Sequence, residues 1–151
     1  MTKIKNIAID RAYLPKALIV DIDGTLAYMI DRTPFEYHKA IGDGVHYHIL
    51  DIVKKYKADD YRIILLSGRD EDCKDVTLEW LMTNDIPYDD LFMRTNKDNR
   101  RDSIVKRELF DANVKDKYNI LFVLDDRLQV CRMWHSIGLN LLRVGDPDAD
   151  F

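Results

Sequence analysis

Short apolar runs alternate with amphipathic stretches along most of this chain of 151 residues. The apolar runs have the length and β-branched content of buried strands, whereas the amphipathic stretches repeat their apolar positions at helical spacing. The predicted strands are residues 17–20, 61–67, 91–93, 119–126 and 138–144. The predicted helices are residues 43–60, 73–85, 102–112 and 129–137, and the third is expected to be capped by Asp102 or Ser103. Strands that alternate with helices predict an α/β fold, a doubly wound, Rossmann-like parallel sheet of about five strands with helices on both faces.

The length predicts one domain over residues 1–151. Residues 1–15 are ambiguous between an edge strand and an ordered N-terminal extension. Residues 28–43 form the largest stretch without a predicted element, and we expect a cap-like loop insertion there in place of a cap domain. Trp80 and Trp134 fall on the apolar faces of their predicted helices, so both are expected in the core.

Composition narrows the class of protein. A net charge of −4 gives no global signal for nucleic acid or membrane, although it leaves room for a local basic patch. Cys73 and Cys131 have no metal or redox spacing, which favours a reducing cytoplasm. No apolar run approaches a membrane span and the N-terminus has no signal-peptide core, so we expect a cytoplasmic protein without a membrane partner. His46 and His48 are two positions apart and are not expected to form a metal pair.

Polar side chains follow three of the predicted strands directly. Asp21 follows the run ALIV and opens the sequence DIDGT, Ser67 ends the second strand, and Asp125 follows the run LFVL. In open α/β sheets the functional crevice lies beyond the carboxyl ends of the strands. The sequence therefore predicts that these groups meet at one edge of the sheet.

Two carboxylates as close as Asp21 and Asp23 repel each other unless a cation lies between them or one stays protonated. Mg²⁺ prefers one or two carboxylates together with phosphate oxygens, and Asp125 and Asp126 bring further carboxylates to the same edge. A carboxylate screened by the metal can attack phosphorus, and a second one can serve as general acid and then as base. The sequence thus predicts a Mg²⁺-dependent nucleophilic aspartate.

The stretches DIDGT (21–25), LLSGR (65–69) and LDD (124–126), together with Lys106, resemble the four ordered motifs of the haloacid dehalogenase superfamily of aspartate-nucleophile phosphohydrolases. The resemblance covers nearly the whole chain. It implies these roles: Asp21 as nucleophile, Asp23 as acid and base, Thr25, Ser67 and Gly68 in phosphate binding, Lys106 in charge neutralisation, and Asp21, Asp23, Asp125 and Asp126 as candidate Mg²⁺ ligands.

The sequence is more closely similar to the 3′-phosphatase domains of bacteriophage polynucleotide kinase-phosphatases. The similarity rests on PKALIVDIDGTLA, SGR, RRDSIVKRELF and LDDRLQVCRMWHSIG. It implies substrate binding by Arg32 and Arg69 and a role for Asp102 beside Lys106, since residues four apart share a helix face. The chain has no G-x-x-x-x-G-K-[ST] loop, so we expect no kinase activity and a phosphatase that stands alone.

Some residues keep two interpretations. Asp126 is either a metal ligand or the N-cap of the last helix. The basic run over residues 94–107 is either a solvated, charged face or a rim that contacts a phosphate backbone.

We expect a phosphoric monoester hydrolase that acts on a 3′-phosphorylated DNA or RNA end or a nucleoside 3′-phosphate, as in nucleic-acid repair. One alternative is a 5′-nucleotidase on free mononucleotides. An alternative of another class is a receiver-like signalling domain, which also forms an aspartyl-phosphate but turns over no substrate. The sequence leaves the oligomeric state open.

Overall fold

The computed structural model describes residues 11–151. Its main sheet has five strands in the order β5-β4-β1-β6-β7, and every neighbouring pair is parallel. The strands are β1 (Lys16–Val20), β4 (Arg62–Asp70), β5 (Asp90–Arg94), β6 (Asn119–Asp125) and β7 (Leu141–Arg143). The predicted α/β class and parallel sheet are confirmed.

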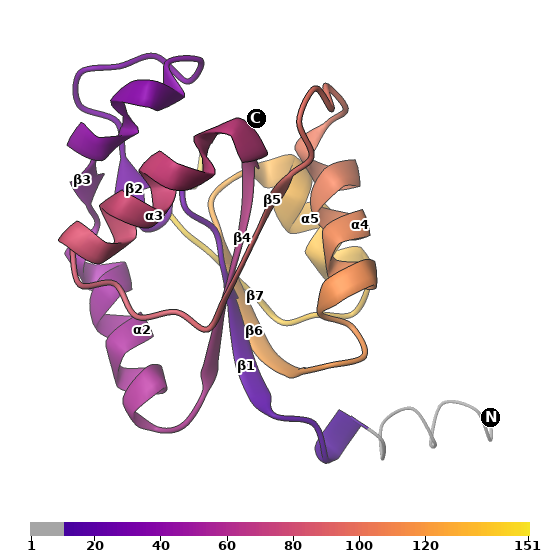
Figure 1. Cartoon of the computed structure of the whole chain (residues 1–151). Coiled ribbons are helices and arrows are strands. Elements are labelled where there is room, and N and C mark those ends of the chain that lie inside the picture. The colour runs from indigo at the N-terminus through magenta and orange to yellow at the C-terminus, as the bar shows by residue number, and fades with distance from the viewer. Residues whose placement is uncertain (1–10) are drawn as a thin grey trace.

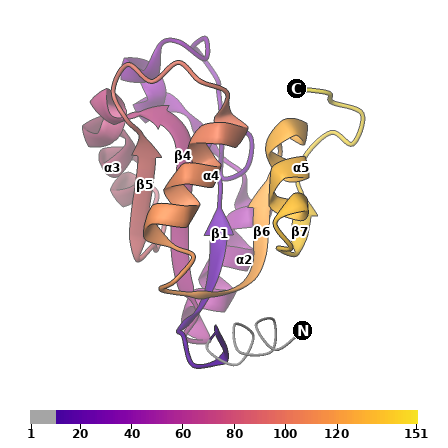
Figure 2. The same cartoon turned by 90° about the vertical axis from the view of Figure 1, so that its right-hand side faces the viewer.

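Two helices cover each face of this sheet (Figures 1 and 2). The helices are α2 (Tyr47–Ala58) and α3 (Lys74–Thr83) on one face, and α4 (Asp102–Asn113) and α5 (Leu128–Ser136) on the other. Side chains alternate along β1, so Leu18 and Val20 face α2 and α3 whereas Ala17 and Ile19 face α4 and α5. Both faces are apolar because both are covered.

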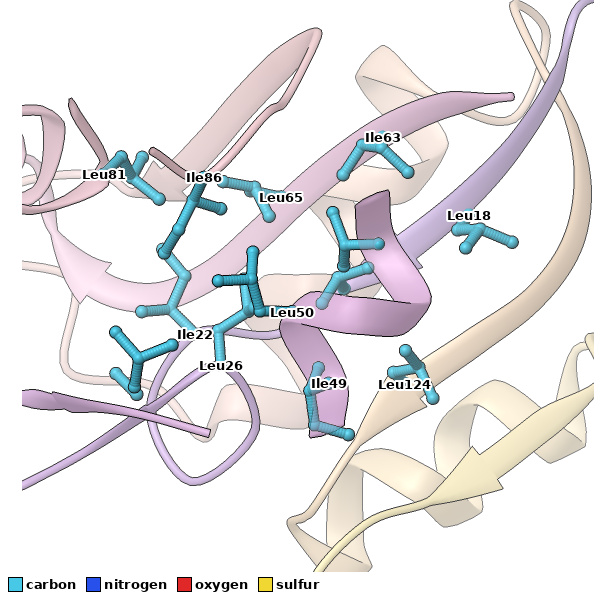
Figure 3. Packing of buried hydrophobic residues seen from close by; sticks show 14 of the residues in the cluster. Leu18, Ile22, Leu26, Ile49, Leu50, Ile63, Leu65, Leu81, Ile86 and Leu124 are labelled. Carbon is cyan, nitrogen blue, oxygen red and sulfur yellow. The ribbon is translucent and has the colours of Figure 1, made fainter. Parts of the chain in front are cut away.

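The core under α2 contains Leu18, Leu65 and Leu124 from three adjacent strands, packed against Ile49 and Leu50 of the helix (Figure 3). The core on the opposite face is built around Trp134 of α5, which packs edge-on against Phe110. Trp80 and Trp134 are both fully buried, as predicted. The two layers of helices hold the carboxyl ends of β1, β4 and β6 in fixed positions side by side.

The segment between β1 and α2 is more structured than the predicted loop. A two-stranded antiparallel sheet joins β2 (Ala27–Tyr28) to β3 (Gly44–Val45), and a 3₁₀ helix η1 (Tyr37–Gly42) lies between them. In Figure 1 this segment rises above the sheet at the upper left, in purple. It is a compact insertion at the carboxyl edge of the sheet.

Several predicted boundaries were wrong. The helix that we expected to begin at residue 43 begins at Tyr47, because Val45 belongs to β3 and pairs with Ala27 of β2. Strand β4 continues through the SGR sequence to Asp70, with an irregular register, whereas we predicted its end at Ser67. A short 3₁₀ helix η2 (Glu71–Cys73) then leads into α3.

The predicted helix caps were also wrong. The N-cap residues of α4 and α5 are Arg101 and Arg127, and neither forms a side-chain capping bond. None of Asp102, Ser103 and Asp126 therefore serves as an N-cap, which removes the capping interpretation of Asp126.

The N-terminal prediction is only partly covered by the structure. Residues 1–10 lie outside the described part of the chain, and residues 11–15 lead into β1 without adding a strand. Within residues 11–151, no helix is both long and apolar enough to cross a membrane.

Candidate active site

Three carboxylates meet where β1 and β6 end. Asp21 follows β1, Asp125 ends β6, Asp126 comes next, and one oxygen of each lies within 4.8 Å of the others. Lys106 reaches this group from α4 and donates to Oδ1 of Asp21 at 2.7 Å and to Oδ2 of Asp125 at 2.8 Å. The convergence of Asp21, Asp125 and Lys106, which are far apart in sequence, agrees with the predicted arrangement.

The electrostatics of the group favour a further cation. Burial raises the pKa of Asp21 well above its usual range, and Asp125 and Asp126 raise it further while Lys106 opposes them. Burial acts to lower the pKa of Lys106, but Asp125 and Asp21 hold it above its ordinary value, so the lysine stays charged. One ammonium faces three carboxylates, and an all-oxygen donor set of this kind suits Mg²⁺. The residues present therefore fit the metal that the sequence predicts.

Gly24 permits the close approach of the turn after β1 to Asp126. Its φ of +82° lies in the left-handed region, and a Cβ built there would lie 2.1 Å from Oδ2 of Asp126. Thr25 is fully buried next to this turn and donates to Oδ2 of Asp21 at 3.1 Å. The glycine-threonine pair thus positions two carboxylates of the group.

Asp23 does not join the three carboxylates, although we predicted it as a metal ligand. Arg69 donates to both its oxygens, at 3.0 Å from Nε and 2.7 Å from Nη2, and Arg32 adds a contact of 3.2 Å. Two guanidinium groups hold this carboxylate, and among the described residues the group close enough to share a metal consists of Asp21, Asp125 and Asp126.

Arg32 and Arg69 were expected to hold substrate beside an open site. Their side chains are 1% and 0% exposed, and neither residue lines the cavity described below. Asp23 lies between these arginines and the cavity in the sense that it lines the cavity and they do not, and Asp43 is the second carboxylate that both arginines contact. Substrate binding by these arginines stays a prediction, and their observed contacts run to Asp23 and Asp43.

Asp102 was expected to orient Lys106, but its hydrogen bonds in the described structure run to Arg94 and Arg127, the latter at 2.6 Å. Burial acts to raise the pKa of Asp102, whereas Lys106 and the bond from Arg127 lower it, and the net shift is downward. Gly68 leaves space for the carboxylate of Asp102, since a Cβ at position 68 would lie 2.6 Å from Oδ1 of Asp102.

The fully buried Ser67 accepts a hydrogen bond from the backbone amide of Arg69 at 3.1 Å. The hydroxyl therefore stabilises the end of β4, and its predicted contact with phosphate stays a prediction. His46 and His48 are partly buried and exposed, respectively. The described residues form no metal-binding group of three around them.

Three participants were missed in the sequence. Asp43 follows η1 in the insertion, Arg127 follows the LDD sequence, and Trp134, which we expected only in the core, donates to Oδ2 of Asp125 at 3.3 Å. Arg127 was the most accessible to sequence reasoning because it follows the predicted strand end directly. No local pattern distinguishes the other two from ordinary loop or core residues.

A cavity of about 890 Å³ opens onto the carboxylates, with Asp21, Asp23, Asp125 and Asp126 among its lining residues. Two loops flank it and rise above the sheet at the upper left and upper right of Figure 1. The insertion contributes Met29, Pro34, Phe35 and Tyr37 to the lining. The end of β5, the segment that follows it and the turn after β6 contribute Arg94, Arg100, Arg101 and Arg127. One part of the lining is apolar and aromatic, and another is basic.

Several arginines of the basic run (residues 94–107) already have partners within the protein, so the run is less available for phosphate than its composition indicates. Arg94 donates to the backbone carbonyl groups of Gly68, Asp98 and Arg100. Arg100 pairs with Asp98 and Glu108, and Arg107 pairs with Asp111. Arg101 lines the cavity without an ion pair in the described part of the chain. Contact of this run with a phosphate backbone stays a prediction, and Arg101 is the arginine whose position leaves room for it.

The fold and the carboxylate site together define a phosphatase of the haloacid dehalogenase superfamily, and thus a phosphoric monoester hydrolase. The chain belongs to the family of polynucleotide kinase PNKP phosphatase domains, whose model matches residues 15–151. This membership favours the hydrolase over the receiver-like alternative.

Relatives agree with this assignment. A protein of Autographa californica nuclear polyhedrosis virus, named as a bifunctional polynucleotide kinase/RNA ligase, is 34% identical over 129 residues, which are 83% of this chain and 18% of the viral protein. Two solved structures of Pnkp1/Rnl/Hen1 complexes contain chains 39% identical to this one, with TM-scores of 0.86 and 0.87. They match 89% and 90% of this chain, but only 48% and 44% of their own. The chain therefore spans less than half of these relatives.

The fold is shared more widely. Class C acid phosphatase from Bacillus anthracis, solved with tungstate bound, aligns over 99% of this chain and 74% of its own, with a TM-score of 0.64 and 12% identity. At this identity the likeness concerns the architecture alone.

Proposed function

We propose that this chain is a Mg²⁺-dependent phosphatase that removes 3′-phosphate from nucleic-acid ends through an aspartyl-phosphate at Asp21. The observation that carries the proposal is the position of Asp21, which lies at the lining of the large cavity, bonded to Lys106 and grouped with Asp125 and Asp126. Mg²⁺ held by this group would polarise the phosphoryl oxygens and screen the carboxylate of Asp21.

The residues of the chain account for two chemical steps. An oxygen of Asp21 attacks phosphorus, the bond from phosphorus to the leaving oxygen breaks, and Asp23 gives that oxygen a proton. Asp23 then takes a proton from water, which attacks the phosphorus, and the bond between phosphorus and Asp21 breaks to release phosphate. Lys106, whose Nζ lies 2.7 Å from Oδ1 of Asp21, balances charge at this carboxylate.

The lining of the cavity supports a nucleic-acid end as substrate. Arginines suit phosphate groups and exposed aromatic rings suit bases, and the cavity offers both. Two polar atoms, Nε of Arg127 and Oε1 of Gln129, are buried without a partner within residues 11–151, and both residues line the cavity. A bound substrate can supply partners for them. A 5′-mononucleotide fits the same chemistry and remains the second candidate substrate.

The relatives indicate a biological setting. A viral relative is named for polynucleotide kinase and RNA ligase activities, and two other relatives are parts of Pnkp1/Rnl/Hen1 complexes. We infer a role in repair of RNA ends, together with partners that supply the other activities. The arginine-lined part of the cavity is compatible with either RNA or DNA, so ribose and deoxyribose substrates must be compared directly.

The test is phosphate release from matched substrates. We expect kcat/KM for a 3′-phosphate oligonucleotide to exceed that for the corresponding 5′-mononucleotide, and a ratio below one would favour the nucleotidase. Ribose and deoxyribose versions of the oligonucleotide decide between RNA and DNA. Asp21→Asn is nearly isosteric, so it should abolish turnover and leave the fold intact. Retention of about a tenth or more of wild-type kcat, a loss of only about 1.4 kcal/mol in transition-state stabilisation, would contradict the nucleophile.

A further inference from the structure

Asp43 sits at the centre of a buried cluster of four charged side chains. Its carboxylate accepts two hydrogen bonds from Arg32, at 2.8 Å from Nε and 2.7 Å from Nη2, and a third from Nη2 of Arg69 at 3.1 Å. The same two arginines also donate to Asp23, and Nη2 of each arginine contacts both carboxylates. The charges alternate, so each guanidinium contacts both carboxylates.

The four members differ in their access to the cavity. The side chains of Arg32, Arg69 and Asp43 are at most 1% exposed, whereas that of Asp23 is 27% exposed and lines the cavity. Asp23 is thus the one member of the four that reaches a substrate in this geometry. The other three form its support.

The backbone at Asp43 is fixed independently of the carboxylate. Its amide donates to the carbonyl of Ala40 at 3.1 Å, and its carbonyl accepts from Nε1 of Trp80 at 2.9 Å. The contact with Trp80 ties the insertion to α3 in the core. Asp43 therefore presents its carboxylate from a rigid position, which is what precise placement of another side chain requires.

The charge of Asp43 is what keeps both arginines in place. Two buried guanidinium groups facing Asp23 alone would carry one unbalanced positive charge, and an unpaired buried charge is strongly unfavourable. With Asp43 present and Asp23 in its carboxylate form, the cluster holds two positive and two negative charges. Without it, one arginine must turn toward solvent or recruit another anion, and Asp23 loses part of its support.

We propose that Asp43 is a positioning residue that acts through Arg32 and Arg69 to hold Asp23 at the leaving oxygen of the substrate. The inference rests on the proposed function, in which Asp23 donates the proton, and it adds a residue outside the four sequence motifs of the site. It also explains why both arginines lie behind Asp23 and do not line the cavity.

A displaced proton donor has a distinctive kinetic signature. Expulsion of phenolate from phenyl phosphate depends on protonation of the leaving oxygen, whereas p-nitrophenolate is stable enough to leave with little help. Loss of the positioning residue should therefore slow phenyl phosphate much more than p-nitrophenyl phosphate. General loss of folded protein lowers the rates for both substrates by the same factor.

The experiment compares kcat/KM for these two substrates in the wild type, Asp43→Asn and Asp89→Asn. Asp89 is the matched control because its carboxylate is also paired, with Lys57 at 2.6 Å, but it lies outside the cavity lining. We expect Asp43→Asn to raise the ratio of p-nitrophenyl phosphate to phenyl phosphate by about tenfold or more, a fraction of the full effect of general acid catalysis. The Asp89→Asn ratio should equal that of the wild type.

A ratio unchanged in Asp43→Asn would overturn the inference and leave Asp43 with a structural role only. If Asp43→Asn does not fold, Arg32→Lys is the second variant, because it keeps the charge but cannot bridge Asp23 and Asp43 through one planar group. It should shift the ratio in the same direction, and an unchanged ratio contradicts the inference. The proposed function fails separately, through undiminished turnover of both substrates by Asp21→Asn.

Discussion

Nζ of Lys106 lies 2.7 Å from Oδ1 of Asp21, although the two residues are 85 positions apart in sequence. Both side chains are almost completely buried, at 2% and 7% exposure. A buried lysine that contacts a nucleophile must satisfy two demands, since it stabilises the carboxylate yet must allow it to attack phosphorus. Lys106 meets both by sharing its charge with Asp125 at 2.8 Å.

Lys106→Met should therefore destabilise the protein when no divalent cation is present. The variant leaves two buried carboxylates, those of Asp21 and Asp125, without their ammonium partner, and breaking a buried ion pair typically costs about 3–5 kcal/mol. Mg²⁺ should restore more thermal stability to this variant than it adds to the wild type, because a ligand that binds the folded state stabilises it. The measurement is Tm in EDTA and in Mg²⁺. Absence of any rise of Tm with Mg²⁺ in both proteins would contradict a cation site at these carboxylates.

Asp125→Ala and Asp126→Ala should separate the roles of the paired aspartates. Asp125 is 1% exposed, accepts from Lys106 and Trp134, and ends β6, so its loss disturbs both charge and packing. Asp126 is partly buried and lines the cavity without a bond to Lys106. We expect Asp125→Ala to lower Tm and remove activity, and Asp126→Ala to keep Tm but raise the Mg²⁺ concentration for half-maximal activity. Full activity of the wild type in excess EDTA would contradict both expectations.

The sequence predicts the carboxylates at the strand ends well, but it does not predict the residues that hold the other site side chains in position. Asp21 and Asp125 follow apolar runs, and the edge at which parallel strands end is fixed by topology, so their convergence can be anticipated. Asp43 is different, because its contacts depend on how the insertion folds back onto α3 through Trp80. Helical spacing from Val45 to Ile49 even favoured the wrong element, since Val45 pairs with β2 instead. Local pattern carries no information about such tertiary pairing.

Asp89 offers a test of stability away from the cavity. Its carboxylate accepts from Nζ of Lys57 at 2.6 Å and from the amide of Ile63 at 2.8 Å. Burial acts to raise the pKa of Asp89, but the bonds from Lys57 and Ile63 outweigh it and the pKa is lowered. A pKa that is lower in the folded state stabilises the protein above the ordinary value of about 3.9, and this contribution is lost as the pH falls through the folded value.

Asp89→Asn should accordingly lower stability at neutral pH by about 1 kcal/mol, since the charge of Lys57 is partly screened by solvent. The difference from the wild type should disappear in acid, below the folded pKa, where both side chains are neutral. Urea unfolding at neutral and acidic pH measures it. A difference that grows toward low pH would reverse the assigned direction.

Phe35 is the most exposed large apolar side chain of the described chain, at 91%, and it lines the cavity with the basic segment. Exposed aromatic rings beside a phosphate site can stack on a nucleobase, and each such contact is worth about 1–3 kcal/mol. We expect Phe35→Ala to lower kcat/KM for a 3′-phosphate oligonucleotide by roughly five- to a hundredfold, while p-nitrophenyl phosphate reacts as before. Phe35→Trp should retain the oligonucleotide activity, since it keeps an aromatic face.

Tyr13 provides the matched control for Phe35, because it is 86% exposed and lies outside the cavity lining. Tyr13→Ala should leave both substrates unaffected. An oligonucleotide whose terminal nucleotide is abasic isolates the contact further, since the phosphate and sugar remain while the base is absent. The abasic substrate should react equally with the wild type and Phe35→Ala. If Phe35→Ala slows the abasic and the complete oligonucleotide by the same factor, the ring supports the insertion and does not bind the base.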